Sequence, residues 1–239
     1  MNAAITALSA AAMAEVDRLM LEELGVGTVQ LMETAGHAIA TFARERCLSD
    51  GVAGARIVAL AGSGGNGGDA LVAARWLAAW GACPSIVLTK PAEAYTGAAA
   101  HQLATVQRMG IPLLAVNDPL PDADLMLDGL LGFSAAGNPR GAVATLIAVA
   151  NAHPAPILAI DLPSGLDATT GAIGVPCIQA TWTLTLVLPK TGLLAPGADA
   201  ACGEITVADI GVPVEILRRA GATLDVSPFA EGWFRALGK

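Results

Sequence analysis

Short apolar runs of strand length alternate with stretches of helical length from residue 56 onward, and this alternation leaves few folds open to the chain. The apolar runs cover residues 56–62, 84–89, 112–116, 123–129, 156–165 and 182–189. Apolar residues at helical spacing separate most of them, over residues 69–80, about 96–109 and about 141–151. Strands that alternate with helices of about ten residues or more pair in parallel through crossover connections. The pattern therefore predicts an α/β fold, a three-layer αβα sandwich around a mostly parallel, doubly wound sheet.

The two ends of the chain read differently from its middle. Apolar residues at helical spacing from residue 13 to about residue 47, interrupted by "GVGT" at 25–28, predict an N-terminal extension of two helices. Residues 203–213 predict a late strand, and the chain from Val214 onward is expected to be helical or irregular. No repeat, linker or break in composition follows residue 50. We therefore expect a single domain over residues 1–239, with a core of about residues 13–213.

Composition and charge exclude several classes of protein. Hydrophobic residues make up 54% of the chain, which suits a sheet covered on both faces. Residues 142–160 and 170–189 are uncharged, but prolines and glycines interrupt them, so neither resembles a membrane span. A net charge of −8 without a cluster of Lys and Arg disfavours nucleic acid as a partner. The N-terminal residues lack the basic region of a signal peptide, which predicts a cytoplasmic protein.

The segment "GSGGNG", residues 62–67, lies between the first apolar run and a helical stretch. It satisfies the pattern G-x-G-x-x-G, whose glycines allow positive φ and let a phosphate approach N–H groups at a helix start. A dehydrogenase of this type would carry an acidic residue about 20 positions on, whereas the second apolar run is followed by Lys90. No Walker lysine follows the glycines either. The segment either binds a diphosphate or forms a tight turn without a ligand.

Polar clusters follow three of the predicted strands, at residues 62–69, 128–141 and 161–171. Ligands bind beyond the carboxyl ends of parallel strands, so we expect these loops to converge. Asp128 and Asp161 each close an apolar run, where a partly desolvated carboxylate suits acid–base chemistry, although each could instead cap the following turn. The segment "DLPSGLDATTG" crowds oxygen atoms around a turn, which suits a hard cation. Lys190 follows the sixth run and either reaches the same edge or is solvated.

Five segments carry a further signal, and they occur in the order "AEVDRLMLEELGVGTVQLMETAG" (14–36), "GSGGNGGDALVAARWL" (62–77), "LDGLLGFSAAGNPRG" (127–141), "IDLPSGLDATTG" (160–171) and "ATWTLTLVLPKTGLL" (180–194). Together they resemble the successive motifs of the YjeF N-terminal domain family, which includes the NAD(P)H-hydrate epimerases. The resemblance implies a Rossmann-like αβα fold, often dimeric, and an isomerase that interconverts the R and S forms of hydrated NADH and NADPH. It also implies a separate ADP- or ATP-dependent dehydratase that acts on the S form.

The resemblance also implies the residues of a site. Asn66, Asp128 and Ser164 would hold a potassium ion, and Asp161 would be the acid–base catalyst. Inversion at C6 of the hydrate, where a hydroxyl adjoins the ring nitrogen, requires proton-assisted loss of hydroxide or ring opening, and a carboxylate can move that proton. The residues that would bind the hydrate are Gly65, Asn66, Gly67, Gly68, Asp69, Gly132, Phe133, Ser134, Ala135, Ala136, Gly137, Asn138 and Asp161.

The chain departs from the usual family motifs at a few positions. Gly65 replaces the first residue of the usual Asn-Asn pair, Ala70 replaces a glycine, and residues 132–135 read Gly-Phe-Ser-Ala where Gly-Thr-Gly-Leu is common. These changes favour an alternative, a non-catalytic nucleotide-binding or scaffold module of the same fold. The retained Asp128, Asp161 and Ser164 favour the epimerase, because a scaffold has no chemical use for them.

Overall fold

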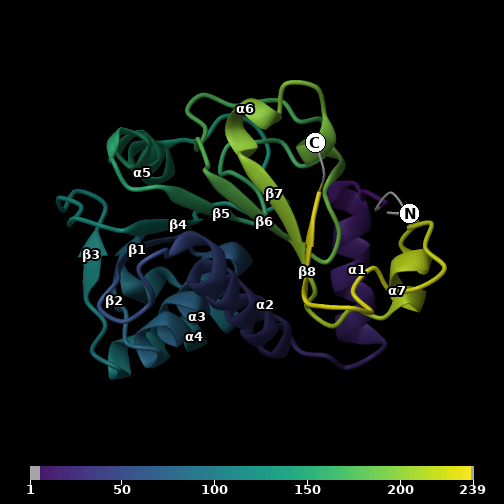
Figure 1. The fold of residues 1–239 in the computed structure, drawn as a ribbon, viewed down its shortest axis with the longest axis horizontal. Helices are drawn as coiled ribbons and strands as arrows, with labels where there is room; N and C mark the ends of the chain where they lie inside the picture. The colour runs from purple at the N-terminus through teal and green to yellow at the C-terminus, as the bar shows by residue number, and fades with distance from the viewer. Residues whose placement is uncertain (1–5, 238–239) are drawn as a thin grey trace.

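The computed structural model describes residues 6–237, which form an eight-stranded sheet with helices packed on both faces (Figure 1). The strands are β1 (Arg56–Ala61), β2 (Cys83–Leu88), β3 (Leu113–Ala115), β4 (Leu125–Gly129), β5 (Ile157–Ile160), β6 (Trp182–Leu186), β7 (Glu204–Ala208) and β8 (Phe234–Ala236). The helices are α1 (Ala10–Glu22), α2 (Thr28–Phe42), α3 (Gly65–Ala79), α4 (Gly97–Arg108), α5 (Gly141–Ala152), α6 (Asp199–Cys202) and α7 (Val214–Arg219). Three short helical segments are η1 (Ala43–Cys47), η2 (Ala92–Ala94) and η3 (Thr191–Leu194).

The winding of the sheet reverses between β1 and β4. The strand order is β3-β2-β1-β4-β5-β6-β7-β8, in which β1 through β7 pair in parallel and β8 is antiparallel to β7. From β1 the chain first proceeds outward to β3, and then returns to β4 on the other side of β1. This Rossmann-like order confirms the predicted fold class, and it places the crevice for a ligand at the carboxyl ends of β1 and β4.

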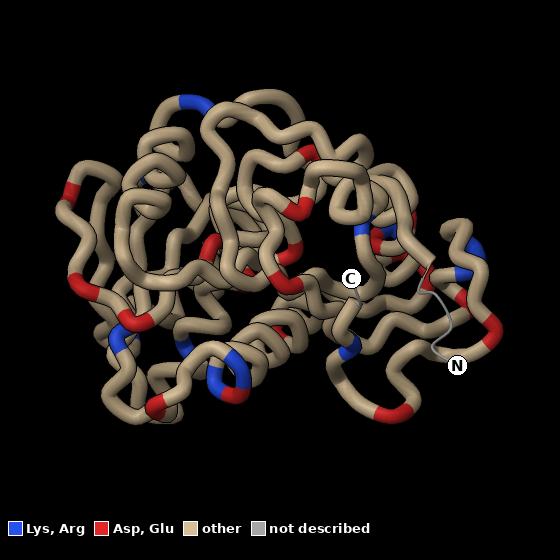
Figure 2. The backbone as a smooth tube through the Cα atoms, turned by 45° about the horizontal axis from the view of Figure 1, so that its top comes forward, with Lys and Arg blue, Asp and Glu red and all other residues tan. Residues whose placement is uncertain are grey.

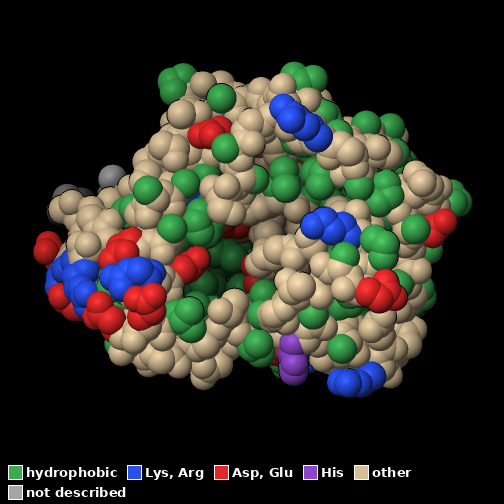
Figure 3. Space-filling model, turned by 180° about the vertical axis from the view of Figure 1, so that it is seen from behind, with side chains coloured by type: hydrophobic (Ala, Val, Ile, Leu, Met, Phe, Trp, Pro, Cys, Tyr) green, Lys and Arg blue, Asp and Glu red, His purple; other side chains and the backbone are tan. Residues whose placement is uncertain are grey.

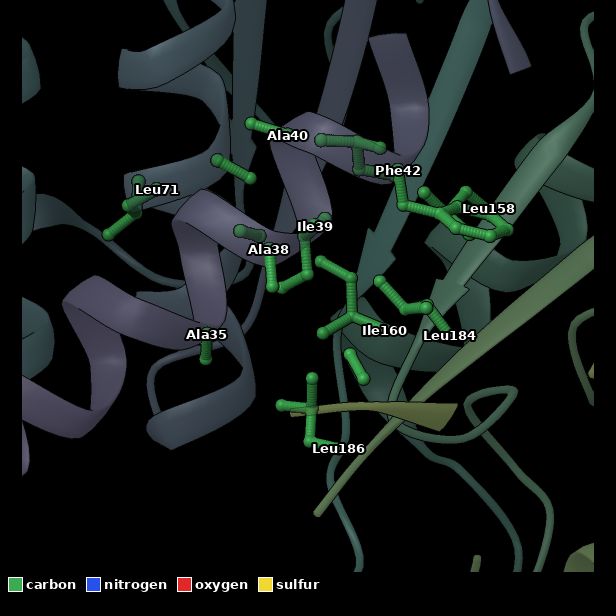
Figure 4. Close-up of a cluster of buried hydrophobic side chains, with 14 of the residues drawn as sticks. Ala35, Ala38, Ile39, Ala40, Phe42, Leu71, Leu158, Ile160, Leu184 and Leu186 are labelled. Carbon is green, nitrogen blue, oxygen red and sulfur yellow. The ribbon is translucent and has the colours of Figure 1, made fainter. Parts of the chain in front are cut away.

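Side chains alternate between two buried faces along the central strands. Ile57 and Ala59 of β1 belong to the core under α2, α3 and α4, whereas Val58 and Leu60 belong to the core under α5. Figure 4 shows side chains of α2 facing those of β5 and β6 on the first of these faces. Burial on both faces explains why the strands read as continuous apolar runs. Within residues 6–237, none of the helices combines the length and apolar character needed for a membrane span.

The two predicted N-terminal helices are α1 and α2, but they do not pack as one layer. Gly25 has a φ of 67°, a conformation that favours glycine, and it separates α1 from α2. Helix α2 packs on α3 and on the sheet, whereas α1 packs against α7 near the C-terminus (Figure 1). The extension is therefore divided between two regions of the molecule.

The glycine-rich segment differs from its predicted conformation. Helix α3 begins at Gly65 and not at residue 69, and none of the glycines from 62 to 68 has a positive φ. Their bareness serves close contact instead. A Cβ on Gly67 would lie 1.7 Å from the carbonyl oxygen of Gly62, and one on Gly62 would lie 2.1 Å from that of Leu130. The expectation of positive φ was wrong. Gly62 and Gly67 lie where backbone segments from β1, α3 and the loop after β4 are in direct contact, and this contact leaves no room for a Cβ.

The C-terminal tail contains one element beyond the expected helix or irregular chain. Helix α7 is present, and β8 then adds an antiparallel strand to the edge of the sheet, with Ala208 of β7 opposite Phe234. A strand of three residues is too short to show a periodic pattern in sequence. It forms because β7 offers a free edge.

We predict that the variant Gly67→Ala is destabilised by about 3 kcal/mol, because a new Cβ in contact with backbone cannot be relieved by moving a side chain. Urea unfolding measures the change. The matched variant Gly65→Ala, in the same helix, places its Cβ where no atom lies within 4 Å, so it should be neutral or slightly stabilising. Equal stabilities of the two variants would contradict the role of close contact.

Candidate functional site

Three loops that are distant in sequence meet at the carboxyl ends of β1, β4 and β5. The side chain of Asn66, in the first turn of α3, donates from Nδ2 to the carbonyl oxygens of Leu131 (2.7 Å) and Ile160 (3.0 Å). One amide group thus ties the start of α3 to the loop after β4 and to the end of β5. The convergence expected from the strand ends is present.

Asp128 and Ser164 form a buried pair behind this junction. Ser164 donates to Asp128 from Oγ (2.6 Å) and from its backbone N (2.8 Å), and the N–H of Leu130 also donates to the carboxylate (3.2 Å). The N–H of Leu131 donates to Ser164 Oγ (2.9 Å), which links the pair to the Asn66 junction. Asp128 is 0% exposed, and this burial raises its pKa to about 6 against the opposing effect of the Ser164 hydrogen bonds.

Asp161 forms a buried ion pair with Lys190. Oδ1 of Asp161 accepts from Lys190 Nζ, from the N–H of Leu186 (3.1 Å) and from Thr185 Oγ1 (3.3 Å). The Lys190 side chain is 1% exposed, so of the two possibilities open in the sequence the structure has the buried one. The backbone on either side of Lys190 is held by Leu8, which donates to Pro189 O and accepts from Thr191 N, each at 2.9 Å.

The backbone at Asp161 is strained. Asp161 has a φ of 66°, and the N–H of Leu162 donates to Ile160 O (2.8 Å) across it, as in a γ-turn. Val187 repeats this arrangement after β6, with a φ of 69° and a bond from Leu188 N to Leu186 O (2.9 Å). Turns of this kind are rare, and such strain persists where surrounding contacts over-determine it, often at functional sites.

Helices α1, α2 and α3 and the loops after β4 and β5 surround a cavity of about 780 Å³, which is large enough for a dinucleotide (Figure 3). Its apolar wall includes Met13 of α1 and Met32 of α2, so the divided N-terminal extension closes the cavity from two sides. Asp69 and Asp161 lie on its inner wall, and Lys90 and Arg140 are exposed residues that line its rim. The cavity therefore joins apolar surface to carboxyl groups inside and to positive charge at its edge.

The predicted site residues fall into three groups. The cavity is lined by Gly65, Asn66, Gly67, Asp69, Gly132, Phe133, Ser134, Ala135 and Asp161. Asp128 and Ser164 lie behind its wall. The remaining predicted residues line other surfaces: Gly68 packs against Met32, Ala136 is exposed, and Gly137 and Asn138 border a smaller cavity of about 260 Å³. Asn138 Oδ1 accepts there from Val175 N at 3.0 Å, which braces the loop.

Several cavity residues were not anticipated from the sequence. Asp17 and Arg18 reach the cavity from α1, and Lys90 and Arg140 reach it from the ends of β2 and of the loop before α5. Arg18 is paired with Glu15 (2.7 Å) and Glu22 (2.6 Å). Acidic and basic positions are interspersed along the backbone (Figure 2). Among these four residues, Lys90 could have been predicted from the sequence, because it follows β2 and the carboxyl ends of parallel strands border the ligand crevice.

Comparison with known proteins gives one family. The profile of the family described as YjeF-related protein N-terminus matches residues 28–192. The chain is 36% identical to an NAD(P)H-hydrate epimerase of Dehalogenimonas lykanthroporepellens, over 96% of this chain and 92% of that protein. It is 38% identical to a bifunctional NAD(P)H-hydrate repair enzyme Nnr of Moorella thermoacetica, over 88% of this chain but 41% of that protein. The crystal structure of the yeast protein ynu0, YNL200c, superposes with a TM-score of 0.80 at 26% identity, covering 98% of this chain and 100% of that one.

We predict that Lys190→Met destabilises the protein by about 3–5 kcal/mol, because it leaves the buried Asp161 carboxylate without its counter-charge. Chemical denaturation at neutral pH measures the loss. The double variant Asp161→Asn with Lys190→Met removes both charges and should recover much of the stability. If the single and double variants were equally stable, the ion pair would not be the source of the effect.

Proposed function

The chain belongs to the family of YjeF-related protein N-termini, and we propose that it is an NAD(P)H-hydrate epimerase, an isomerase that interconverts the R and S forms of hydrated NADH and NADPH. Relatives of nearly equal length carry that name. The observation that supports the proposal most directly is the position of Asp161, a carboxylate held in a strained turn on the wall of a cavity of dinucleotide size. A strained, ion-paired carboxylate facing such a cavity suits acid–base chemistry better than it suits a scaffold.

The cavity orients the substrate in this proposal. The start of α3 presents free N–H groups and the positive end of a helix dipole, which suit the diphosphate, and Lys90 and Arg140 add positive charge at the rim. The hydrated ring then lies toward Asp161. Among the predicted binding residues, the ones that line the cavity make the contacts, and Gly68, Gly137 and Asn138 support the loops that carry them.

Asp161 moves the proton in the reaction. At C6 of the hydrate the hydroxyl adjoins the ring nitrogen, so the centre inverts when it becomes planar and water returns to the other face. The donors to Asp161 within residues 6–237 all contact Oδ1, so Oδ2 accepts no hydrogen bond from these residues, and Asp161 lines the cavity. An oriented carboxylate of this kind contributes about 100-fold or more to such a step.

We further propose that Asn66, Asp128 and Ser164 hold a potassium ion. Their donors fit, because the group offers carboxylate, hydroxyl and amide oxygens together with the carbonyls of Leu131 and Ile160, and it lacks the sulfur and imidazole ligands that favour zinc. A cation would also offset the buried charge of Asp128. Within residues 6–237 no Lys or Arg pairs with this buried carboxylate. A bound cation supplies the positive charge that offsets it.

The reaction implies a partner activity. A dehydratase that consumes the S form draws the R form through the epimerase, and we propose that it is a separate ADP- or ATP-dependent enzyme. Bifunctional repair enzymes are among the relatives, and this chain spans about two-fifths of the length of the one from Moorella thermoacetica, 41%. We also propose a homodimer and a cytoplasmic location, as the family resemblance implies.

The epimerase is tested by mixing the purified protein with racemic hydrated NADH and an S-specific dehydratase. We expect the whole of the hydrate to be consumed, faster than spontaneous inversion allows. We expect Asp161→Asn, assayed below its lowered Tm where it is still folded, to lose about 100-fold or more of the rate. Consumption of only half the hydrate by the wild-type protein would instead support the non-catalytic module.

The cation site is tested by thermal unfolding in potassium chloride against choline chloride. We expect potassium to raise the Tm, by about 2–4 °C for each 1 kcal/mol of stabilisation in a chain of this length. The gain should appear as the pH rises through about 6, because Asp128 attracts a cation only when ionised, and it should vanish in Asp128→Asn. Asp122→Asn, whose side chain is 91% exposed, should keep the gain. A potassium response in Asp128→Asn equal to that of the wild type would refute the site.

A further inference from the structure

Two carboxyl groups and one ammonium group share the wall of the cavity, and they come from three different segments. Asp69 lies in the second turn of α3, Asp161 follows β5, and Lys190 precedes η3. The family resemblance assigns Asp69 to substrate binding alone. Its surroundings point to a chemical role as well.

The hydrogen-bond donors of the Lys190 ammonium group are all used by Asp161 and its neighbours on β6. A lysine has three N–H donors, and those of Lys190 lie within hydrogen-bonding distance of Asp161 Oδ1, Leu186 O (2.8 Å) and Thr185 Oγ1 (3.3 Å). No donor is left for Asp69. Lys190 is therefore the counter-charge of Asp161 and not of Asp69.

Asp69 has no such compensation. Its carboxyl forms no hydrogen bond or ion pair with any other part of residues 6–237. It lies beyond the first turn of α3, where the helix dipole has little effect. Burial raises the pKa of Asp69 well above its usual range, the charges of Asp161 and Asp17 raise it further, and Lys190 opposes them. Burial and the lack of a partner therefore favour the protonated form of Asp69, whereas Asp161 has Lys190 as its counter-charge.

We propose that Asp69 is a second catalytic carboxyl, the acid that protonates the departing C6 hydroxyl while Asp161 serves as the base. The proposal rests on the epimerase function and deepens it. Two carboxyls whose surroundings separate their protonation states form a natural acid and base. They come from different elements, one from α3 and one from the end of β5, and both line the cavity that would hold the hydrated ring.

The step balances in protons and electrons. Asp69 gives its proton to the hydroxyl oxygen, the C6–O bond breaks, and the lone pair of the ring nitrogen forms a C=N bond while water leaves. A water molecule then adds to the opposite face of C6, its proton passes to Asp161, and the π electrons return to nitrogen. Asp69 is now the carboxylate and Asp161 the acid, which is the state required for the reverse inversion. A proton transfer through cavity water restores the starting state.

Kinetics of Asp69→Asn test the role of the acid. We expect kcat to fall about 100-fold or more with KM within about threefold of wild type, since the amide keeps the shape but cannot supply the proton. Asp122→Asn, exposed at the opposite end of the sheet, is the matched control and should retain wild-type kcat. A raised KM with kcat unchanged in Asp69→Asn would show a binding role only and would overturn the proposal.

The pH profile gives a second readout. Wild-type kcat/KM should decline at alkaline pH as Asp69 loses its proton, and the residual activity of Asp69→Asn should lack this decline. The charges that act on Asp69 are those of Asp161, Asp17 of α1 and Lys190. The other charged residues of the cavity lining are Arg18, Glu22, Lys90 and Arg140. An alkaline decline that persists unchanged in Asp69→Asn would assign the titration to one of these groups and would contradict the proposal.

Two measurements separate this inference from the function on which it rests. Infrared difference spectra of the free protein at neutral pH, wild type minus Asp69→Asn, should contain the band of a protonated carboxyl whether or not the protein is an epimerase. Its absence would overturn the inference even if inversion is observed. In water labelled with ¹⁸O, each catalysed inversion should replace the C6 oxygen, and retention of that oxygen would overturn the step written above. A wild-type protein that shows the band without inversion would instead overturn the epimerase.

Discussion

The buried ion pair between Lys190 and Asp161 is the interaction on which the rest of the site depends. It joins the segments that follow β5 and β6, and its carboxylate belongs to a residue with a φ of 66°, a strained conformation that surrounding contacts must hold. A charge pair taken out of water is weak support for stability but strong support for one geometry, because either partner alone would be an uncompensated charge. The pair therefore fixes which carboxyl at the cavity has a counter-charge.

A second constraint is the direct contact of backbone segments at the crevice. The glycines at 62 and 67 let β1, the start of α3 and the loop after β4 approach more closely than any side chain allows. This contact brings Asn66 into reach of Leu131 and Ile160. Leu131 in turn donates to Ser164, which is hydrogen-bonded to Asp128. The geometry of the polar site therefore depends on the close packing of the glycines.

Three buried or partly buried carboxyls at this end of the sheet have three different sets of partners. Asp161 has a lysine, Asp128 has neutral donors and a set of oxygen ligands that suits a cation, and Asp69 has neither. Burial raises the pKa of Asp128 to about 6 and that of Asp69 well above its usual range, whereas Asp161 is paired with a buried lysine. The proposed inversion needs an acid and a base, and Asp69 and Asp161 are the carboxyls that we propose for these two roles.

The sequence by itself determined the α/β class, the order of the strands along the chain, and the loops that contain Asp128, Asp161 and Ser164. These features follow from the spacing of apolar residues and from turn-forming residues, which are local properties of the sequence. Its motifs also indicated the family. Only the tertiary structure decided that Lys190 is buried and not solvated, that α1 brings Asp17 across to the cavity, and that the glycines serve contact and not positive φ. β8 likewise required a partner strand. In each case the outcome depends on which distant segment lies opposite, and no pattern along one segment carries that information.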